Sequence, residues 1–240
     1  MSTLLLRLAA PMQAWGVDGK FDKRPTEFEP TRSGIIGMIA CAMGIEREES
    51  LDIFENMKIG VRVDQQGEKY KDFHMVHKYN EKTKKVDSSW LTSRYYLFDA
   101  VFLVGIKAED FFLEKIKEAF ESPVFPIYLG RRSCPPTGKI ALGIRRDKNL
   151  KEALEEEPWL AADWYKKRST KEVVSLRVVK DIEPGEKEAY TVRDIPISFS
   201  QRHRKYDFRS VAVTWVKITS EKVDEVLVDQ IQTNHNPMDI

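Results

Sequence analysis

The pattern of hydrophobic and polar positions along the chain predicts alternating strands and helices. Four apolar runs, at residues 3–8, 58–63, 95–106 and 124–129, have the length and composition of buried strands. Two further segments space their apolar residues three and four positions apart, as helices packed on one face do. The first begins at Thr31 or Ser33 and ends at Gly44, and the second covers residues 108–120. The order β-α-β-β-α-β predicts an α+β, ferredoxin-like fold.

Three other stretches add to this core. Residues 69–94 contain two β-like pieces around a turn-rich centre, which predicts a protruding hairpin, a thumb. After residue 150 the pattern changes to a short acidic helix at 151–159 and strands at 173–179, 189–197 and 210–218. We therefore expect two domains, 1–150 with the thumb at about 69–94, and a small β-rich unit at 151–240 with a polar tail. A short helix is also expected at 48–56, and the long connection at 11–30 is expected to be functional.

Composition excludes several classes of protein. The chain has 240 residues, with 39 basic and 38 acidic side chains and a net charge of +1, so it is not uniformly basic. It has no apolar run of about 18 residues, the length that a transmembrane helix needs. Two cysteines, Cys41 and Cys134, cannot build a disulfide framework, and we expect a cytoplasmic protein with no membrane association.

The distribution of charge is more informative than its sum. Residues 69–94, 123–146 and 201–209 are poor in acids and rich in lysine and arginine, and each carries aromatic or imidazole rings. Positive charge interleaved with rings that can stack is typical of proteins that bind single-stranded nucleic acid. From composition alone, solvated lysine-rich loops explain the same pattern equally well.

Signs of catalysis or of a cofactor are missing from the sequence. No nucleophile elbow, phosphate-binding loop or dinucleotide-binding glycine pattern occurs. His74 and His77 are three residues apart, so on a strand they would face opposite sides and would not share a metal ion. We expect neither a metal nor a cofactor. A general base for metal-independent RNA cleavage could be His74, His77, Tyr79 or His203, but these residues could equally stack or donate hydrogen bonds.

Two loops have the chemistry of phosphate-binding elements. In the first, Thr31 to Gly34, a helix begins beside Arg32, and the free N–H groups of a helix N-terminus attract anions. An ordinary capped helix is the alternative. In the second, Gly130 permits a turn, the adjacent Arg131 and Arg132 can bind phosphates or stack on bases, and two prolines stiffen the exit.

Several of these segments resemble one known family. They are LLLRLAAPMQAWG at 4–16, PTRSGIIG at 30–37, YLGRRSCPP at 128–136, GVRVD at 60–64, DFH at 72–74 and RYYLFDA at 94–100. Together they are similar, in order and spacing, to the CasD family of subunits of Cascade, the type I-E CRISPR RNA-guided surveillance complex. The resemblance covers residues 4 to about 145, and the C-terminal part matches only loosely.

The resemblance implies a RAMP-type fold at one end of Cascade, where the subunit grips the 5′ handle of the CRISPR RNA (crRNA). It implies the backbone subunit CasC and the large subunit CasA as neighbours, and target DNA as a contact only through the assembled complex. In this branch of the family a different subunit, CasE, cuts the precursor RNA, whereas relatives in another branch cut it themselves. We therefore expect a non-catalytic clamp of the crRNA that also helps to assemble the complex. The alternatives are a metal-independent endoribonuclease that processes pre-crRNA repeats and a pure protein scaffold.

The candidate RNA-binding residues come from four places in the chain. Tryptophan is more often a core residue than a ligand, so Trp15 has an alternative role. Arg7 on the first strand is a further candidate. The set comprises Gln13 and Trp15 in the first loop, Arg32 and Ser33 at the helix start, His74, His77 and Arg94 on or beside the thumb, and Arg131, Arg132 and Ser133 in the later loop.

Overall fold

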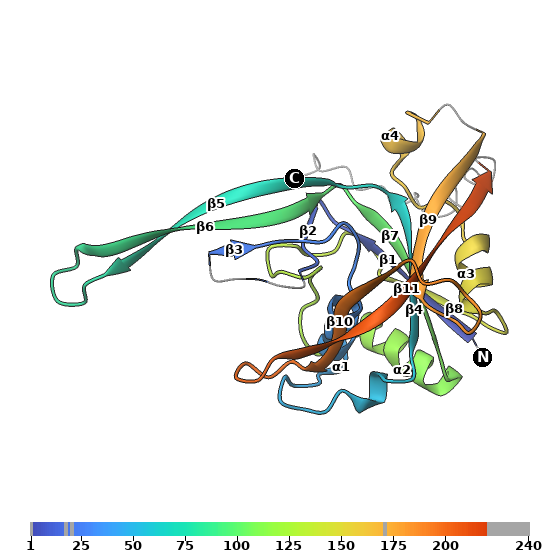
Figure 1. The fold of residues 1–240 in the computed structure, drawn as a ribbon, viewed down its shortest axis with the longest axis horizontal. Helices are drawn as coiled ribbons and strands as arrows, with labels where there is room; N and C mark the ends of the chain where they lie inside the picture. The colour runs from blue at the N-terminus through green and yellow to red at the C-terminus, as the bar shows by residue number, and fades with distance from the viewer. Residues whose placement is uncertain (1, 17–18, 20–21, 170–171, 220–240) are drawn as a thin grey trace, which may run out of the picture.

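The computed structural model describes residues 2–16, 19, 22–169 and 172–219. It is an α+β structure with mostly antiparallel sheets and few helices (Figure 1). The main sheet has the order β10-β11-β9-β4-β7-β1-β8, and all of its neighbouring strands are antiparallel. Its strands are β1 (Ser2–Ala9), β4 (Lys58–Gln65), β7 (Val101–Ala108), β8 (Ala141–Arg145), β9 (Val173–Asp181), β10 (Tyr190–Ser198) and β11 (Lys205–Thr219). The polar tail expected at the C-terminus lies outside the described residues.

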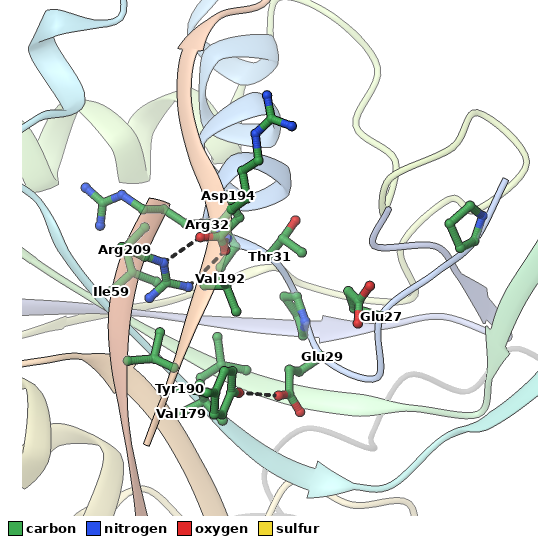
Figure 2. A pocket seen from close by; sticks show the side chains of 16 residues that line it. Glu27, Glu29, Thr31, Arg32, Ile59, Val179, Tyr190, Val192, Asp194 and Arg209 are labelled. Atoms are coloured by element: carbon green, nitrogen blue, oxygen red, sulfur yellow. Dashed lines mark hydrogen bonds and ion pairs between the residues drawn. The ribbon is translucent and has the colours of Figure 1, made fainter. Parts of the chain in front are cut away.

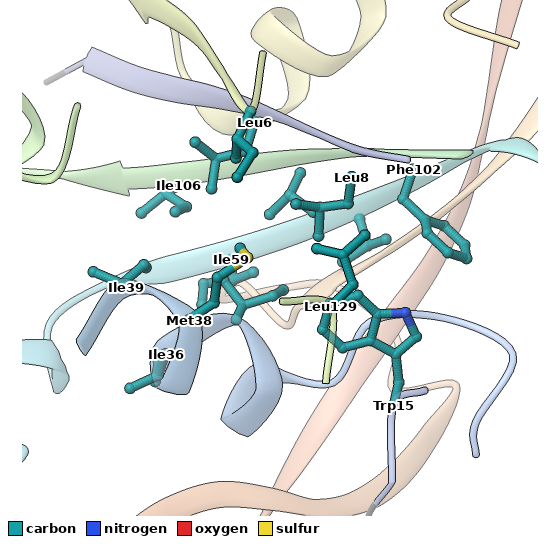
Figure 3. Close-up of a cluster of buried hydrophobic side chains, with 14 of the residues drawn as sticks. Leu6, Leu8, Trp15, Ile36, Met38, Ile39, Ile59, Phe102, Ile106 and Leu129 are labelled. Carbon is teal, nitrogen blue, oxygen red and sulfur yellow. The ribbon is translucent and has the colours of Figure 1, made fainter. Parts of the chain in front are cut away.

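Helices cover both faces of this sheet. Strand β1 alternates its side chains, so Leu4, Leu6 and Leu8 join the core beneath α1 (Arg32–Met43) and α2 (Asp110–Glu121), as Figure 3 shows for Leu6 and Leu8. Leu5 points to the opposite face, where it packs in a second cluster with residues of α3 (Leu150–Glu156). A short helix, α4 (Asp163–Lys166), follows α3.

Helix α1 confirms the start and stop signals in the sequence. The Thr31 side chain caps the helix by accepting a hydrogen bond from the Gly34 N–H at 3.2 Å. Gly44 ends it with a φ of 79°, which glycine adopts without strain. The helix expected at 48–56 was wrong in extent, because only a 3-10 turn, η1 (Asp52–Phe54), forms there.

The predicted hairpin is present and is longer than expected. Strands β5 (Glu68–Tyr79) and β6 (Val86–Phe98) pair along their whole length and project from the body (Figure 1). We call this hairpin the thumb. Only its root is joined to other strands, because β2 (Met12–Gln13) and β3 (Lys23–Arg24) pair with the inner end of β6. The long connection at 11–30 therefore serves partly to brace the thumb.

Two strand predictions were wrong. The apolar run at 95–106 is two strands, β6 and β7, because Asp99 takes a left-handed conformation with a φ of 54° and turns the chain. The run at 124–129 forms no strand, since Pro126 supplies no N–H for a ladder. Its position in the core order is taken by β8, which pairs with β1.

The C-terminal strands extend the main sheet. Strand β9 pairs with β4 through Gly60 and Lys180, so hydrogen bonds run across the sheet from the first half of the chain to the second. Strands β10 and β11 then follow at the outer edge. The division into two domains at about residue 150 stays a prediction.

Candidate nucleic-acid interface

A groove of about 1040 Å³ lies beside α1. The loop at 125–135 and the connection between β10 and β11 form its other sides. Three arginines, Arg47, Arg132 and Arg204, line it, and within the described residues none of them forms an ion pair with a carboxylate. The lining also includes the carboxylates of Glu46 and Glu48 beside Arg47. Aromatic residues and two α1 glycines form further parts of the surface: Phe125, Tyr128, Phe199, Tyr206, Gly34 and Gly37. Arginines beside rings can hold a single strand by phosphate contact and base stacking.

Arg131 and Arg132 are adjacent but have different surroundings. Arg132 is exposed and lines the groove, whereas Arg131 is half-buried. The Arg131 guanidinium donates to the carbonyl oxygens of Tyr95 at 3.0 Å and Arg24 at 2.9 Å. Gly130 makes this divergence possible, since its φ is 87° and a Cβ there would lie 1.7 Å from the Ala14 carbonyl oxygen.

A polar cluster forms where this loop meets the thumb. The Tyr96 and Ser133 hydroxyl oxygens are 3.4 Å apart, and the Arg131 guanidinium lies 4.7 Å from the centroid of the Tyr96 ring. Burial raises the pKa of the Tyr96 phenol, but hydrogen bonds from Ser133 and Arg131 and the charge of Arg131 outweigh burial and lower the pKa overall. Arg94 also contacts this phenol and forms no ion pair within the described residues. The structure thus brings Arg94, Arg131 and Ser133 together.

The two thumb histidines lie on opposite faces, as their spacing predicted. Residues opposite each other in an antiparallel pair share a face, and His74 pairs with Thr92 while Arg94 pairs with Asp72. His74 contacts Asp72 and lies on the same face as Arg94. His77 is on the other face, where its Nδ1 is 2.7 Å from the Ser89 hydroxyl. Only His74 continues the polar surface that begins at the root of the thumb.

Gln13 and Trp15 have internal roles rather than exposed ones. Trp15 is 1% exposed and packs in the main core (Figure 3), where its Nε1 donates to the Gln13 side-chain oxygen at 3.0 Å. The Gln13 amide donates in turn to the Ala100 carbonyl oxygen at 2.7 Å. Trp15 also lines the groove. Because it is almost fully buried, the commoner role of tryptophan, that of a core residue, applies here.

The side chain of Arg32 also binds partners within the protein. Its guanidinium donates to Asp181 at 2.7 Å and to the Met57 carbonyl oxygen at 2.9 Å. A carboxylate of the protein takes the place expected for a phosphate at the start of α1, because the Arg32 backbone N–H donates to Asp194 at 2.7 Å. Arg209 binds both of these carboxylates, and its bonds to Asp194 are visible in Figure 2. These four charges balance one another and join α1 to the C-terminal strands.

The two other candidates, Ser33 and Arg7, also have partners within the protein. The Ser33 side chain is buried against Thr31, with their hydroxyl oxygens 3.3 Å apart, and lines the groove. Arg7 is half-buried and donates to the Thr137 carbonyl oxygen at 3.1 Å. Its donor therefore has a partner in the protein.

Sequence reasoning missed two arginines of the groove. Arg204 lies in the acid-poor stretch at 201–209, and the charge of that stretch is the signal that points to it. Arg47 lies within the acidic stretch around Glu46 and Glu48, where composition conceals it. Only the tertiary structure places these two side chains opposite Arg132.

The described residues form neither a metal-binding cluster nor a membrane-spanning helix. In the part of the chain that the structure describes, no three His, Cys, Asp or Glu side chains are grouped to hold a metal ion. No helix among the described residues is long and apolar enough to span a membrane.

Comparison with known proteins gives one consistent result. Residues 3–212 match the model of a family described as CRISPR-associated protein (Cas_Cas5). The CRISPR system Cascade subunit CasD of Escherichia coli (strain K12) is 32% identical over 184 residues, covering 70% of this chain and 82% of that protein. A solved CRISPR RNA-guided surveillance complex contains a chain with a TM-score of 0.76 and 30% identity, covering 91% of this chain and 92% of its own. Another structure, of a Cas protein, has a TM-score of 0.65 and 34% identity, covering 92% of this chain and 96% of its own. This chain therefore belongs to the Cas5 family of CRISPR-associated proteins.

Proposed function

We propose that this protein is a non-catalytic, crRNA-binding subunit of a Cascade-type complex that clamps the 5′ handle and helps to assemble the complex. One observation carries the proposal. Arg47, Arg132 and Arg204 line a single groove with aromatic rings, and they lack carboxylate partners in the described structure. A single-stranded RNA end exposes phosphates and unstacked bases, so this surface suits it.

The rest of the proposal follows from the family. The strand order β4-β7-β1-β8 with α1 and α2 supports a ferredoxin-like core of the RAMP type. We infer CasC and CasA as neighbouring subunits, a cytoplasmic location, and contact with target DNA only in the assembled complex. Matches to CasD and to a chain of a surveillance complex support these inferences.

The thumb geometry favours a clamp over an endoribonuclease. Metal-independent cleavage needs a base beside the 2′-hydroxyl and a second group that stabilises the developing charge. His74 and His77 lie on opposite faces of the thumb and contact Asp72 and Ser89. The two imidazoles therefore do not form one acid–base pair, and cleavage would need a single histidine with a cation, such as His74 with Arg94 on the same face.

Binding of crRNA tests this proposal. We expect the purified chain to bind RNA that carries the 5′ handle more tightly than RNA with a scrambled handle, measured by fluorescence anisotropy. The slope of log affinity against log salt concentration is negative, and we call its magnitude the salt slope. Arg132→Ala and Arg204→Ala should each lower the salt slope by about 0.7, the value for one phosphate contact with a single strand. Arg146→Ala is the matched control, because Arg146 is exposed but paired with Glu114.

The alternatives give different results. Cleavage of unprocessed repeat RNA in EDTA, lost in His74→Ala or His77→Ala, would establish the endoribonuclease. Equal affinity for the intact and scrambled handles, with an unchanged salt slope in Arg132→Ala and Arg204→Ala, would instead support a pure protein scaffold.

A further inference from the structure

We propose that Arg131 is a positioning residue that fixes the direction of the thumb relative to the groove, and that it does not itself bind a phosphate. This inference rests on the proposed RNA-binding function. It separates two adjacent arginines that the sequence alone treats as a pair.

The first argument is the number of chain segments that meet at Arg131. Its Nη1 donates to Tyr95 of β6, and its Nη2 donates to Arg24 of β3. A longer contact of 3.4 Å joins Nη2 to the Pro25 carbonyl oxygen. The backbone oxygen of Arg131 also accepts the Cys134 N–H at 2.8 Å. One residue thus links the thumb, the connection at 11–30 and its own loop.

The second argument is where this link lies. Tyr95 is at the inner end of β6, next to Tyr96, whose ring the Arg131 guanidinium covers. The strands β2 and β3 that brace this end are only two residues long each. Farther out, β5 and β6 form a two-stranded ribbon whose side chains are mostly exposed, as Phe73, Met75 and Leu91 are. A ribbon of this kind has little stability of its own, so its direction is set at the root.

The third argument is the use of the donors. A guanidinium presents its five N–H groups in a rigid plane. Nη1 and Nη2 of Arg131 donate to main-chain oxygens of the protein, and the guanidinium also hydrogen-bonds the Tyr96 phenol. A phosphate that took these donors would leave the carbonyl oxygens of Tyr95 and Arg24 without them. Arg132 has no such partners in the described structure and lines the groove. Arg131 therefore orients the surface on which Arg132 binds.

The experiment compares matched variants at both positions, with handle-containing RNA and a salt titration. Lysine keeps the charge but cannot reach both Tyr95 and Arg24. We expect Arg131→Lys and Arg131→Ala to weaken binding by about tenfold each, because a released thumb must be ordered again on binding. Their salt slopes should equal that of the wild type. Arg132→Lys should bind almost as the wild type does, and Arg132→Ala should lower the slope by about 0.7.

A distance measurement tests the positioning role without RNA. Spin labels at Lys82→Cys on the thumb tip and Glu118→Cys on α2 would report the direction of the thumb, in a Cys41→Ser background because that thiol is half-exposed. We expect a narrow distance distribution in the wild type and a broad one in Arg131→Lys, with the same thermal midpoint. In Arg132→Lys the distribution should stay narrow.

Two outcomes would overturn the inference. One is a lower salt slope in Arg131→Ala, equal to that of Arg132→Ala, because it would make Arg131 a phosphate ligand. The other is an unchanged distance distribution in Arg131→Lys. If the wild type shows no preference for the handle, the proposed function fails, while the distance distributions still decide the role of Arg131.

Discussion

Arg62 and Asp64 form a fully buried ion pair on β4, with Nε and Nη2 each 2.7 Å from one carboxylate oxygen. The remaining guanidinium donors bind the carbonyl oxygens of Leu154 in α3 and of Glu157 and Pro158 just beyond it. All five N–H groups of the arginine therefore have partners. The pair joins the centre of the sheet to the segment that covers its back face.

Asp64→Asn should destabilise the protein strongly. The substitution leaves the Arg62 charge buried without a counter-ion, and breaking a buried pair in this way costs about 3–5 kcal/mol. Urea unfolding followed by circular dichroism measures the change. Asp110→Asn is the control, since Asp110 is half-exposed and its 3.7 Å contact with Arg146 should contribute less than about 1 kcal/mol. Equal effects of the two variants would contradict the role assigned to the buried pair.

Two glycines of α1 should respond to alanine in opposite ways. A Cβ on Gly34 would lie 2.8 Å from the buried Trp15 ring, so Gly34→Ala should cost about 1–3 kcal/mol by overpacking. A Cβ on Gly37 would meet only Phe199, at an ordinary 3.6 Å, so Gly37→Ala should gain about 0.5–1 kcal/mol of helix stability. Thermal unfolding of both variants checks this. A stabilised Gly34→Ala would mean that Trp15 is free to move aside.

Arg32→Ala should change stability rather than RNA contact. Its loss removes one of the two guanidinium groups that bind Asp181, whereas the backbone N–H that binds Asp194 remains. Breaking this buried pair should lower the free energy of unfolding by about 3 kcal/mol. At a temperature where the variant is folded, its salt slope for RNA should equal that of the wild type. A stable variant with a lower slope would instead make Arg32 a direct phosphate ligand.

The Tyr96 phenol gives a pH-dependent signal at the thumb root. Its pKa is raised by burial but lowered overall by Ser133 and Arg131. Removing the guanidinium in Arg131→Leu should therefore raise this pKa, so that the phenol ionises at higher pH. Nuclear magnetic resonance of ring-labelled tyrosine follows the titration. Arg132→Leu should leave it unchanged, and a lowered pKa in Arg131→Leu would contradict the contact.

Local signals in the sequence predicted the main elements well. Thr31 and Gly44 mark the ends of α1, and two β-like pieces around a turn-rich centre predicted the thumb. Errors arose where one residue outweighed a hydrophobic pattern. Asp99 turns the chain within an apolar run, and Pro126 prevents a strand in another.

The candidate site was only partly predictable, for a physical reason. Whether an arginine is free for a ligand depends on carboxylates and carbonyl groups that can be distant in sequence. Arg32 meets Asp181 and Asp194 only after the sheet has formed, and Arg131 meets Tyr95 and Arg24 at the thumb root. No local pattern around either arginine reports these partners, whereas Arg132 keeps the exposure that its loop suggested.

The ion network at the start of α1 also constrains how the protein can mature on the ribosome. Asp181, Asp194 and Arg209 come from strands near the end of the described chain, while Arg32 is made early. Chains are synthesised from the N-terminus at about 5–20 residues per second, and domains generally fold as units. Arg32 therefore remains without these carboxylates for seconds, until the strands that carry them have been made. A nascent chain arrested before β11 should consequently be protease-sensitive even in its first half.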